Sequence, residues 1–165
     1  HLPIEAGFSS LGRTFVITRE KEDRLIARAL KIAKQRMGYD AEFSFESPEA
    51  VTNYLLLWAV ERSEEHFGVI WLTAKHRVIS HEILFRGTID GAGVYPRVVV
   101  KNGLAVNAAA AVVFHNHPSG DSSPSQADIH LTTKLKEALL LVDIRLLDHM
   151  IVGTTINSMA EAGYL

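Results

Sequence analysis

The sequence has no cysteine, no excess of charge of one sign and no long hydrophobic run. The absence of cysteine excludes disulfides, thiolate nucleophiles and every zinc or iron–sulfur site built on sulfur. A metal site in this chain would therefore need histidine and carboxylate ligands. The longest apolar runs, such as residues 108–114, are much shorter than the roughly 20 residues of a membrane-spanning helix, and no signal-peptide pattern opens the chain. We therefore expect a cytoplasmic protein with no membrane partner.

Net charge and chain length further limit the kinds of partner and the number of domains that we expect. Seventeen Lys and Arg face nineteen Asp and Glu, and the formal net charge of -2 provides no global field that would attract nucleic acid or anionic membranes. Any contact with nucleic acid must therefore be local. A chain of 165 residues is long enough for one compact domain and too short for two.

The first 45 residues are predicted to form an irregular arm followed by a basic amphipathic helix. Residues 1–18 show no hydrophobic period, which is typical of an arm. Residues 19–37 carry an apolar stripe at helical spacing, and Arg24, Arg28 and Lys31 lie off that stripe. Charged helix faces are usually just solvated, but this one could contact phosphate groups of a nucleic acid.

Residues 46–165 alternate between strand and helix patterns. A helix and a hairpin come first, and single strands then alternate with helices. This order predicts an α/β fold in which a mixed β-sheet is flanked by helices on both faces, with right-handed crossovers. The predicted strands are 67–73, 78–85, 109–114 and 144–152, and the predicted helices begin at Pro48, Pro96 and Ser125.

The clearest chemical pattern is a His-x-His pair, His115 and His117, followed by Pro118 and, after a short polar loop, by Asp128. Because side chains alternate along a strand, the two histidines project to the same side, where they can share one cation. Asp128 lies in the first turn of the next helix, so its carboxylate can turn back toward the imidazoles. Two nitrogens and one oxygen suit Zn²⁺, and three protein ligands leave a fourth position for water, as in catalytic zinc sites.

Hydrolysis at such an ion also needs a proton acceptor. Zinc lowers the pKa of bound water to near 7, but a base must still take the proton. We predict Glu82 for this role, because its strand could lie beside the histidine strand in the same sheet. Ser125 could donate a hydrogen bond to an oxyanion. Together these groups are what amide hydrolysis requires.

Each of these residues also has a purely structural interpretation. Ser125 and Asp128 form Ser-x-x-Asp at a helix start, which resembles a capping box. An isolated His-x-His at a strand end is more often hydrogen-bonded in a turn than bound to a metal. The combination favours a metal site, because all of these features serve one three-ligand centre. Asp148-His149, in the last long strand, could supply a hydrogen-bond acceptor behind a ligating imidazole.

Longer motifs surround these residues. They are Glu82–Thr88, Val94–Arg97, His115–Gly120, Pro124–Asp128, Leu146–His149 and Ile151–Gly153. They resemble the JAMM (MPN-type) metalloprotease motif, a distant Glu with His-x-His-x7-Ser-x2-Asp, and more closely the bacterial RadC family, over about Ser47 to Leu165.

The resemblance implies a fold, a metal and roles for individual residues. The implied fold is the mixed sheet between helices of JAMM and cytidine-deaminase-like domains. Zn²⁺ would bind to His115, His117 and Asp128, with Glu82 as the general base and Ser125 as the oxyanion donor. Domain boundaries follow as residues 1–45 for the arm and basic helix and residues 46–165 for the RadC-like JAMM domain.

The resemblance also carries two different functional labels. RadC proteins are commonly labelled as DNA repair proteins, whereas related JAMM enzymes include isopeptidases that remove ubiquitin-like modifiers. Longer RadC relatives carry an upstream helix-hairpin-helix segment, which residues 1–45 do not match, and Asn116 fits RadC better than the isopeptidases. We therefore predict a zinc-dependent metallohydrolase that acts on a peptide or protein substrate. The alternative is a DNA-associated or protein-binding module whose zinc site is structural or vestigial, with Arg24, Arg28 and Lys31 as contacts.

Overall fold

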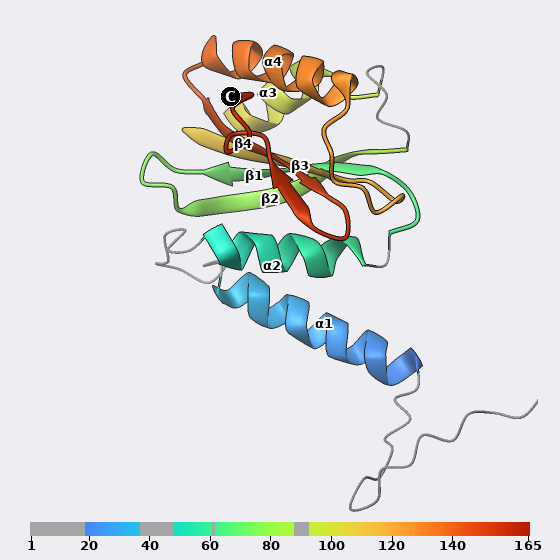
Figure 1. The fold of residues 1–165 in the computed structure, drawn as a ribbon. Helices are drawn as coiled ribbons and strands as arrows, with labels where there is room; N and C mark the ends of the chain where they lie inside the picture. The colour runs from blue at the N-terminus through green and yellow to red at the C-terminus, as the bar shows by residue number, and fades with distance from the viewer. Residues whose placement is uncertain (1–18, 37–47, 61, 88–92) are drawn as a thin grey trace, which may run out of the picture.

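The computed structural model describes residues 19–36, 48–60, 62–87 and 93–165. The predicted arm, residues 1–18, lies outside the described residues. Along the described chain two helices and a hairpin come first, and a helix, a strand, a helix and two strands follow (Figure 1), largely as the hydrophobic patterns predict. The helices are α1 (Arg19–Arg36), α2 (Pro48–Ala59), α3 (Pro96–Ala105) and α4 (Gln126–Leu140), and the strands are β1 (His66–Leu72), β2 (Val78–Arg86), β3 (Ala110–Asn116), β4 (Arg145–Val152) and β5 (Ile156–Ser158).

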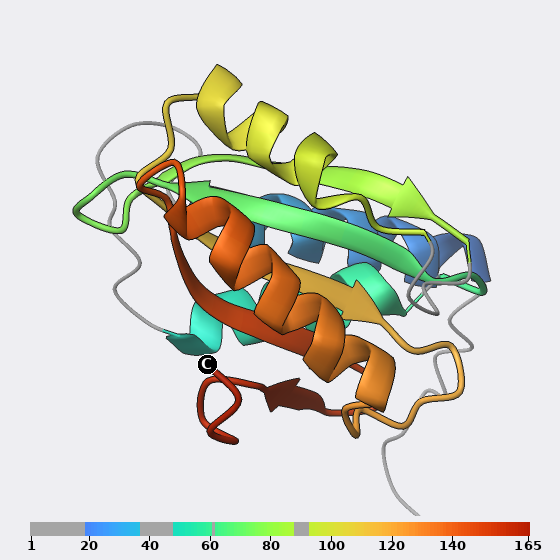
Figure 2. The same cartoon turned by 90° about the horizontal axis from the view of Figure 1, so that it is seen from above.

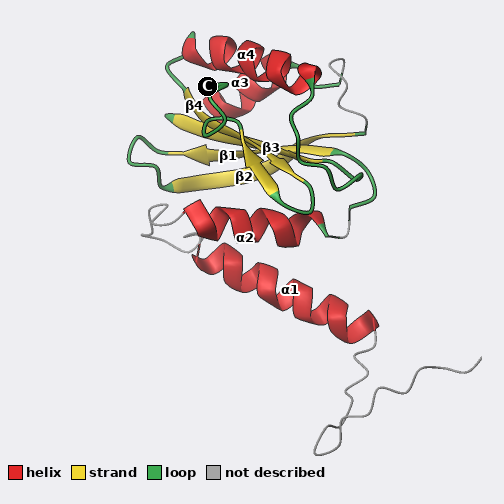
Figure 3. Cartoon of the chain, viewed as in Figure 1, coloured by secondary structure: helices red, strands yellow, loops and turns green. Residues whose placement is uncertain are grey.

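The strands form one mixed sheet in the order β2-β1-β3-β4-β5. β3 and β4 are parallel and are joined through α4, whereas the other neighbouring strands are antiparallel. Helix α2 covers one face of the sheet and α3 and α4 cover the other, while α1 packs on the outer side of α2 (Figures 1 and 3). The predicted α/β fold, a mixed sheet flanked by helices on both faces, is confirmed.

Each face of the sheet has its own apolar core. On the side of α2, which we call the α2 face, Phe114 of β3 packs with Trp58, their ring centroids 5.0 Å apart. On the side of α3 and α4, the α4 face, Trp71 and Val113 pack with Leu135 of α4. Because side chains alternate along a strand, β1 and β3 contribute to both cores. β3 is buried along its whole length, as expected for a central strand covered on both faces.

Two features of the sheet differ from the sequence-based expectation. β5 was not predicted, because three residues are too few for a hydrophobic period to be visible. β2 is an edge strand and lies beside β1, not beside β3. The antiparallel pairing of β1 with β3 therefore separates the second strand of the hairpin from the histidine strand.

Helix α1 exposes the basic side chains that the sequence singled out. Arg24, Arg28 and Lys31 are all exposed, and α1 contacts α2 through its apolar side. Among the helices of the described residues, none is both long and apolar enough to cross a membrane.

Candidate metal centre

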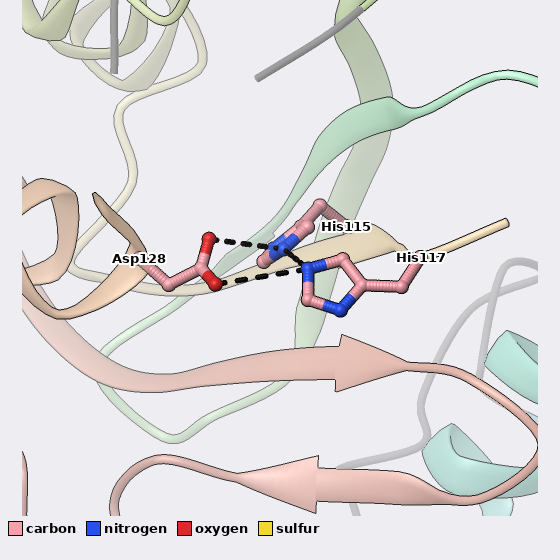
Figure 4. Close-up of side chains that lie close together, drawn as sticks. All are labelled: His115, His117 and Asp128. Atoms are coloured by element: carbon pink, nitrogen blue, oxygen red, sulfur yellow. Dashed lines mark hydrogen bonds and ion pairs between the residues drawn. The ribbon is translucent and has the colours of Figure 1, made fainter. Parts of the chain in front are cut away.

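The structure brings His115, His117 and Asp128 together at the carboxyl end of β3 (Figure 4). Nε2 of His115 lies 2.8 Å from Nε2 of His117 and 3.2 Å from Oδ1 of Asp128. Nε2 of His117 lies 3.6 Å from Oδ2 of Asp128. Ligands of a tetrahedral zinc ion with bonds of 2.0–2.1 Å are about 3.3 Å apart, so the three distances bracket the separation that zinc requires.

Each of the three side chains is placed by a different element. His115 is the penultimate residue of β3, is 1% exposed and faces α4. His117 follows the end of β3, where its backbone N–H donates to the Val152 carbonyl oxygen over 2.8 Å. Asp128 lies in the first turn of α4 and is buried. The strand end, loop and helix start predicted from the sequence therefore do converge.

Ser125 holds the Asp128 carboxylate in place. The backbone N–H and the hydroxyl of Ser125 donate to Oδ2 of Asp128 over 2.8 and 2.6 Å, and the Asp128 N–H donates back to the Ser125 hydroxyl over 3.1 Å. This is the predicted capping box. Burial raises the pKa of Asp128, but hydrogen bonding and charge from His115 and the two Ser125 donors lower it more, so it lies well below its usual range. The cap and the metal site are thus compatible, because the same bonds orient the ionised carboxylate.

The loop after β3 fixes the orientation of His117. Nδ1 of His117 lies 2.7 Å from the carbonyl oxygen of Asp121. Because a carbonyl oxygen can only accept, Nδ1 donates a proton to it, and Nε2 is the ring nitrogen that faces His115 and Asp128. The loop itself is held by the Thr154 N–H, which donates to the Gly120 carbonyl oxygen over 2.8 Å. Gly153 permits this approach, since a Cβ there would lie 2.3 Å from the same oxygen.

The donor set fits a divalent cation. Two imidazole nitrogens and the oxygens of an ionised carboxylate converge, with separations of 2.8, 3.2 and 3.6 Å. Imidazole nitrogen with carboxylate oxygen is a ligand set that suits Zn²⁺. Behind His115 lies His149, whose pKa is lowered well below its usual range by burial and by the proximity of His115.

A cavity of about 300 Å³ opens onto this group and is lined by Glu65, a residue that the sequence analysis did not select. Glu65 directly precedes β1. Asn116 holds the backbone on both sides of it. The Asn116 amide nitrogen donates to the Glu64 carbonyl oxygen over 3.0 Å, and the His66 N–H donates to the Asn116 amide oxygen over 2.8 Å. The backbone of Glu65 is therefore fixed beside the metal ligands.

Glu82 is not among the residues that line this cavity. It pairs with Val69 of β1, and Val69 pairs with Val113 of β3, so one whole strand lies between Glu82 and the histidine strand. Two strand spacings amount to about 10 Å. The expectation that its strand lies beside β3 is wrong, and with it falls the geometric reason for choosing Glu82.

A signal for Glu65 does exist in the sequence. The first hairpin strand pairs antiparallel with β3, so its beginning lies beside the end of β3, and Phe67 is opposite His115. An acidic residue just before that strand is therefore placed near the histidines, and Glu65 lines the same cavity as they do. Local periodicity cannot reveal this, because it does not encode which strand is the neighbour.

Comparison with known proteins identifies the family. The model of the RadC-like JAB domain matches residues 45–164. A UPF0758 protein of Azotobacter vinelandii is 57% identical over 123 residues, which are 74% of this chain and 55% of that protein. A UPF0758 protein of Stutzerimonas stutzeri is 56% identical over the same shares of the two chains. The match thus spans about half the length of these two relatives.

A UPF0758 protein of Vibrio cholerae is similar over a longer region. It is 47% identical over 153 residues, which are 93% of this chain and 96% of that protein. The family match covers most of the chain and includes His115, His117, Asp128 and Glu65. The chain therefore belongs to the RadC-like JAB domain family.

Proposed function

We propose that the protein is a zinc-dependent hydrolase of the JAMM type that cleaves a peptide or isopeptide bond. The observation that carries this proposal is the convergence of His115, His117 and Asp128 in a cavity that also contains a carboxylic acid, Glu65. Membership of the RadC-like JAB domain family supports the same chemistry. A Lewis acid site with a nearby proton acceptor is the minimum that amide hydrolysis needs.

Different residues would bind the metal, orient its ligands and transfer the proton. His115, His117 and Asp128 hold the ion, and Ser125 orients Asp128 through two hydrogen bonds. When bound, zinc would polarise the scissile carbonyl and lower the pKa of water. Glu65 accepts a proton from the attacking water and passes it to the leaving amine.

Glu65 replaces Glu82 as the proposed general base. The role proposed for Ser125 is to orient Asp128, not primarily to donate to an oxyanion. Glu65 lines the cavity and is held between two backbone bonds to Asn116, which suits a group that must keep a fixed position. The Ser125 hydroxyl donates its one proton to Asp128 over 2.6 Å. Donation to an oxyanion would require that bond to break, so the oxyanion role of Ser125 remains a prediction from the family resemblance.

The test compares Glu65, which directly precedes the hairpin, with Glu82, which lies in its second strand. The full chain, loaded with zinc, is incubated with a library of quenched fluorogenic peptides and with a lysine-linked isopeptide. Glu65→Gln should keep its zinc and lose at least about 100-fold in hydrolysis rate. Glu82→Gln, the matched control, should stay within a few-fold of the parent. A Glu65→Gln protein as active as the parent, or a parent chain that binds no zinc, would contradict the proposal.

A second candidate function rests on helix α1. Arg24, Arg28 and Lys31 are exposed at helical spacing, which suits contact with a phosphate backbone. Binding to a DNA duplex should then fall steeply with salt, and Arg24→Ala with Arg28→Ala should reduce the salt slope by about 2. Lys136→Ala, an exposed lysine on α4, serves as the control. Binding that does not depend on salt, or no binding, would favour the hydrolase alone.

A further inference from the structure

A row of buried side chains lies behind His115, on the side away from the cavity. Nδ1 of His115 lies 2.8 Å from Nε2 of His149 on β4. Nδ1 of His149 lies 2.7 Å from the hydroxyl of Thr132 on α4, and that hydroxyl donates to the Asp128 carbonyl oxygen over 2.6 Å. His149 and Thr132 are both 0% exposed. Buried polar groups in a continuous hydrogen-bonded row call for an explanation.

The Thr132 hydroxyl has two acceptors, the Asp128 carbonyl oxygen at 2.6 Å and the Met159 sulfur at 3.3 Å, and the oxygen is the stronger of the two. The Asp128 carbonyl oxygen can only accept, so at 2.6 Å the one hydroxyl proton of Thr132 points to it. Nδ1 of His149 must then be the donor toward the Thr132 oxygen.

The arrangement continues through the two imidazoles. A histidine that binds a metal through Nε2 carries its proton on Nδ1, and Nδ1 of His115 lies 2.8 Å from Nε2 of His149. Nε2 of His149 therefore accepts, and the proton between the two rings belongs to Nδ1 of His115. This arrangement leaves Nε2 of His115, the atom that faces His117 and Asp128, to bind the metal.

We propose that His149 is a positioning residue of the metal centre, which acts through His115 and is itself oriented by Thr132. This inference rests on the proposed function, because it assigns a role toward the zinc ion. The row Thr132–His149–His115 selects the tautomer of His115 and fixes its ring so that Nε2 is the metal-binding atom. Hydrogen-bond partners behind metal-ligating histidines commonly act in this way.

The row also fixes the positions of two candidate ligands, His115 and Asp128, relative to one another. It starts at the backbone oxygen of Asp128 and ends at Nε2 of His115, which lies 3.2 Å from Oδ1 of the same Asp128. α4, β4 and β3 each contribute one member of the row, so a shift of α4 along the sheet would change both ligands together. The relative position of His115 and Asp128 is thus fixed before a metal binds.

The neighbouring Asp148 has a separate structural role. Its Oδ1 accepts from the backbone N–H groups of His149 and Ala160 over 2.7 and 3.0 Å, and its Oδ2 accepts from the Ser158 hydroxyl over 2.6 Å. These bonds connect β4 to the C-terminal turn and do not involve the His149 ring. Of the predicted Asp148-His149 pair, only His149 contacts a metal ligand.

A purely structural role for His149 makes the opposite prediction from a positioning role. The ring also packs in the core, with its centroid 5.9 Å from that of Phe67. If His149 only fills space, His149→Leu should be the better tolerated change, since leucine restores apolar packing. If His149 accepts a hydrogen bond from His115, His149→Gln should be the better tolerated change, because the glutamine amide oxygen can take the place of Nε2.

The experiment measures zinc affinity by competition with a chromophoric chelator, with thermal unfolding as the check on folding. His149→Leu should bind zinc 10- to 100-fold more weakly than the parent, and His149→Gln should stay within about threefold. Equal affinities for His149→Leu and the parent would overturn the inference while the proposed function stands, and so would His149→Gln binding more weakly than His149→Leu. A parent chain that binds no zinc would contradict both the inference and the proposed function.

A second measurement needs no substitution. Nitrogen-15 NMR of the zinc-loaded parent should show the proton of His115 on Nδ1, the proton of His149 also on Nδ1, and a scalar coupling across the bond between the rings. A zinc-loaded His115 ring without a proton on Nδ1 would overturn the inference, whatever the stability of the variants.

Discussion

The two faces of the sheet are built from the same strands and serve different purposes. Phe114 and His115 are neighbours on β3, yet Phe114 packs with Trp58 under α2, and His115 bonds to His149 under α4. The α2 face is apolar where β1, β3 and β4 meet α2. The α4 face, over which α3 and α4 lie (Figure 2), is apolar in its middle and becomes polar at the carboxyl end of β3.

The difference shows how a small fold combines stability with chemistry. An apolar face needs only to be filled, and its side chains are exchangeable within limits of volume. A buried polar group needs a partner of the right kind at each donor and acceptor. On the α4 face Ser125, Thr132, His149 and the Asp121 carbonyl supply those partners for the candidate ligands. We therefore expect substitutions on the α2 face to change stability and those at the polar end to change metal binding.

The largest effect on stability should come from Phe114→Ala on the α2 face. The ring is fully buried, and its removal leaves a cavity beside Trp58, so the free energy of unfolding should fall by about 3–5 kcal/mol. Urea denaturation measures this loss, and Phe114→Leu should lose clearly less. Zinc affinity of the folded fraction should stay within a few-fold of the parent. Lost zinc binding in folded Phe114→Ala would break the distinction between the faces.

Removal of zinc should be the next largest effect, and it acts on the α4 face alone. At a free zinc concentration 100 times its dissociation constant, binding stabilises the folded state by about 2.7 kcal/mol, or roughly 5–10 °C in Tm. Chelation should reverse this shift in differential scanning fluorimetry, and His117→Ala should abolish it. Asp143→Asn, at an exposed acid outside the site, should leave the zinc-dependent shift unchanged. A zinc-dependent shift that survives in His117→Ala would mean that the ion binds elsewhere.

Gly153→Ala should have a smaller effect, located at the junction of the loop with β4. The added Cβ would lie 2.3 Å from the Gly120 carbonyl oxygen, a backbone atom, so the loop that orients His117 must shift. We expect a loss of about 1–3 kcal/mol in stability together with weaker zinc binding. Thr154→Ala, which keeps the backbone bond to Gly120, is the control for loop contacts. Unchanged zinc affinity in Gly153→Ala would show that the loop does not position His117.

The smallest predicted effect is that of Ser125→Ala. Loss of the cap at the start of α4 should cost about 1 kcal/mol of unfolding free energy, and Ser125→Thr should restore most of it. Because Asp128 keeps its contact with His115, zinc binding should weaken but persist. Complete loss of zinc in a folded Ser125→Ala protein would show that the cap and the metal site are one unit.

Sequence reasoning succeeded where the relevant residues are close along the chain. The grouping of His115, His117 and Asp128 could be predicted because one strand, one loop and one helix start contain all three. The cap at Ser125 has a local pattern for the same reason. The geometric argument for Glu82 failed because it depended on strand order, which places β1 between β2 and β3.

The amino-acid sequence by itself determined the helices and most strands, the family, and a ligand set of two imidazoles and one carboxylate. These features depend on spacing along the backbone, and that spacing is present in the unfolded chain. Only the tertiary structure decided that Glu65 lines the cavity and that His149 and Thr132 stand behind His115. The reason is that these side chains meet through the pairing of β1 and β4 with β3 and the docking of α4, and such long-range contacts leave no period in the sequence.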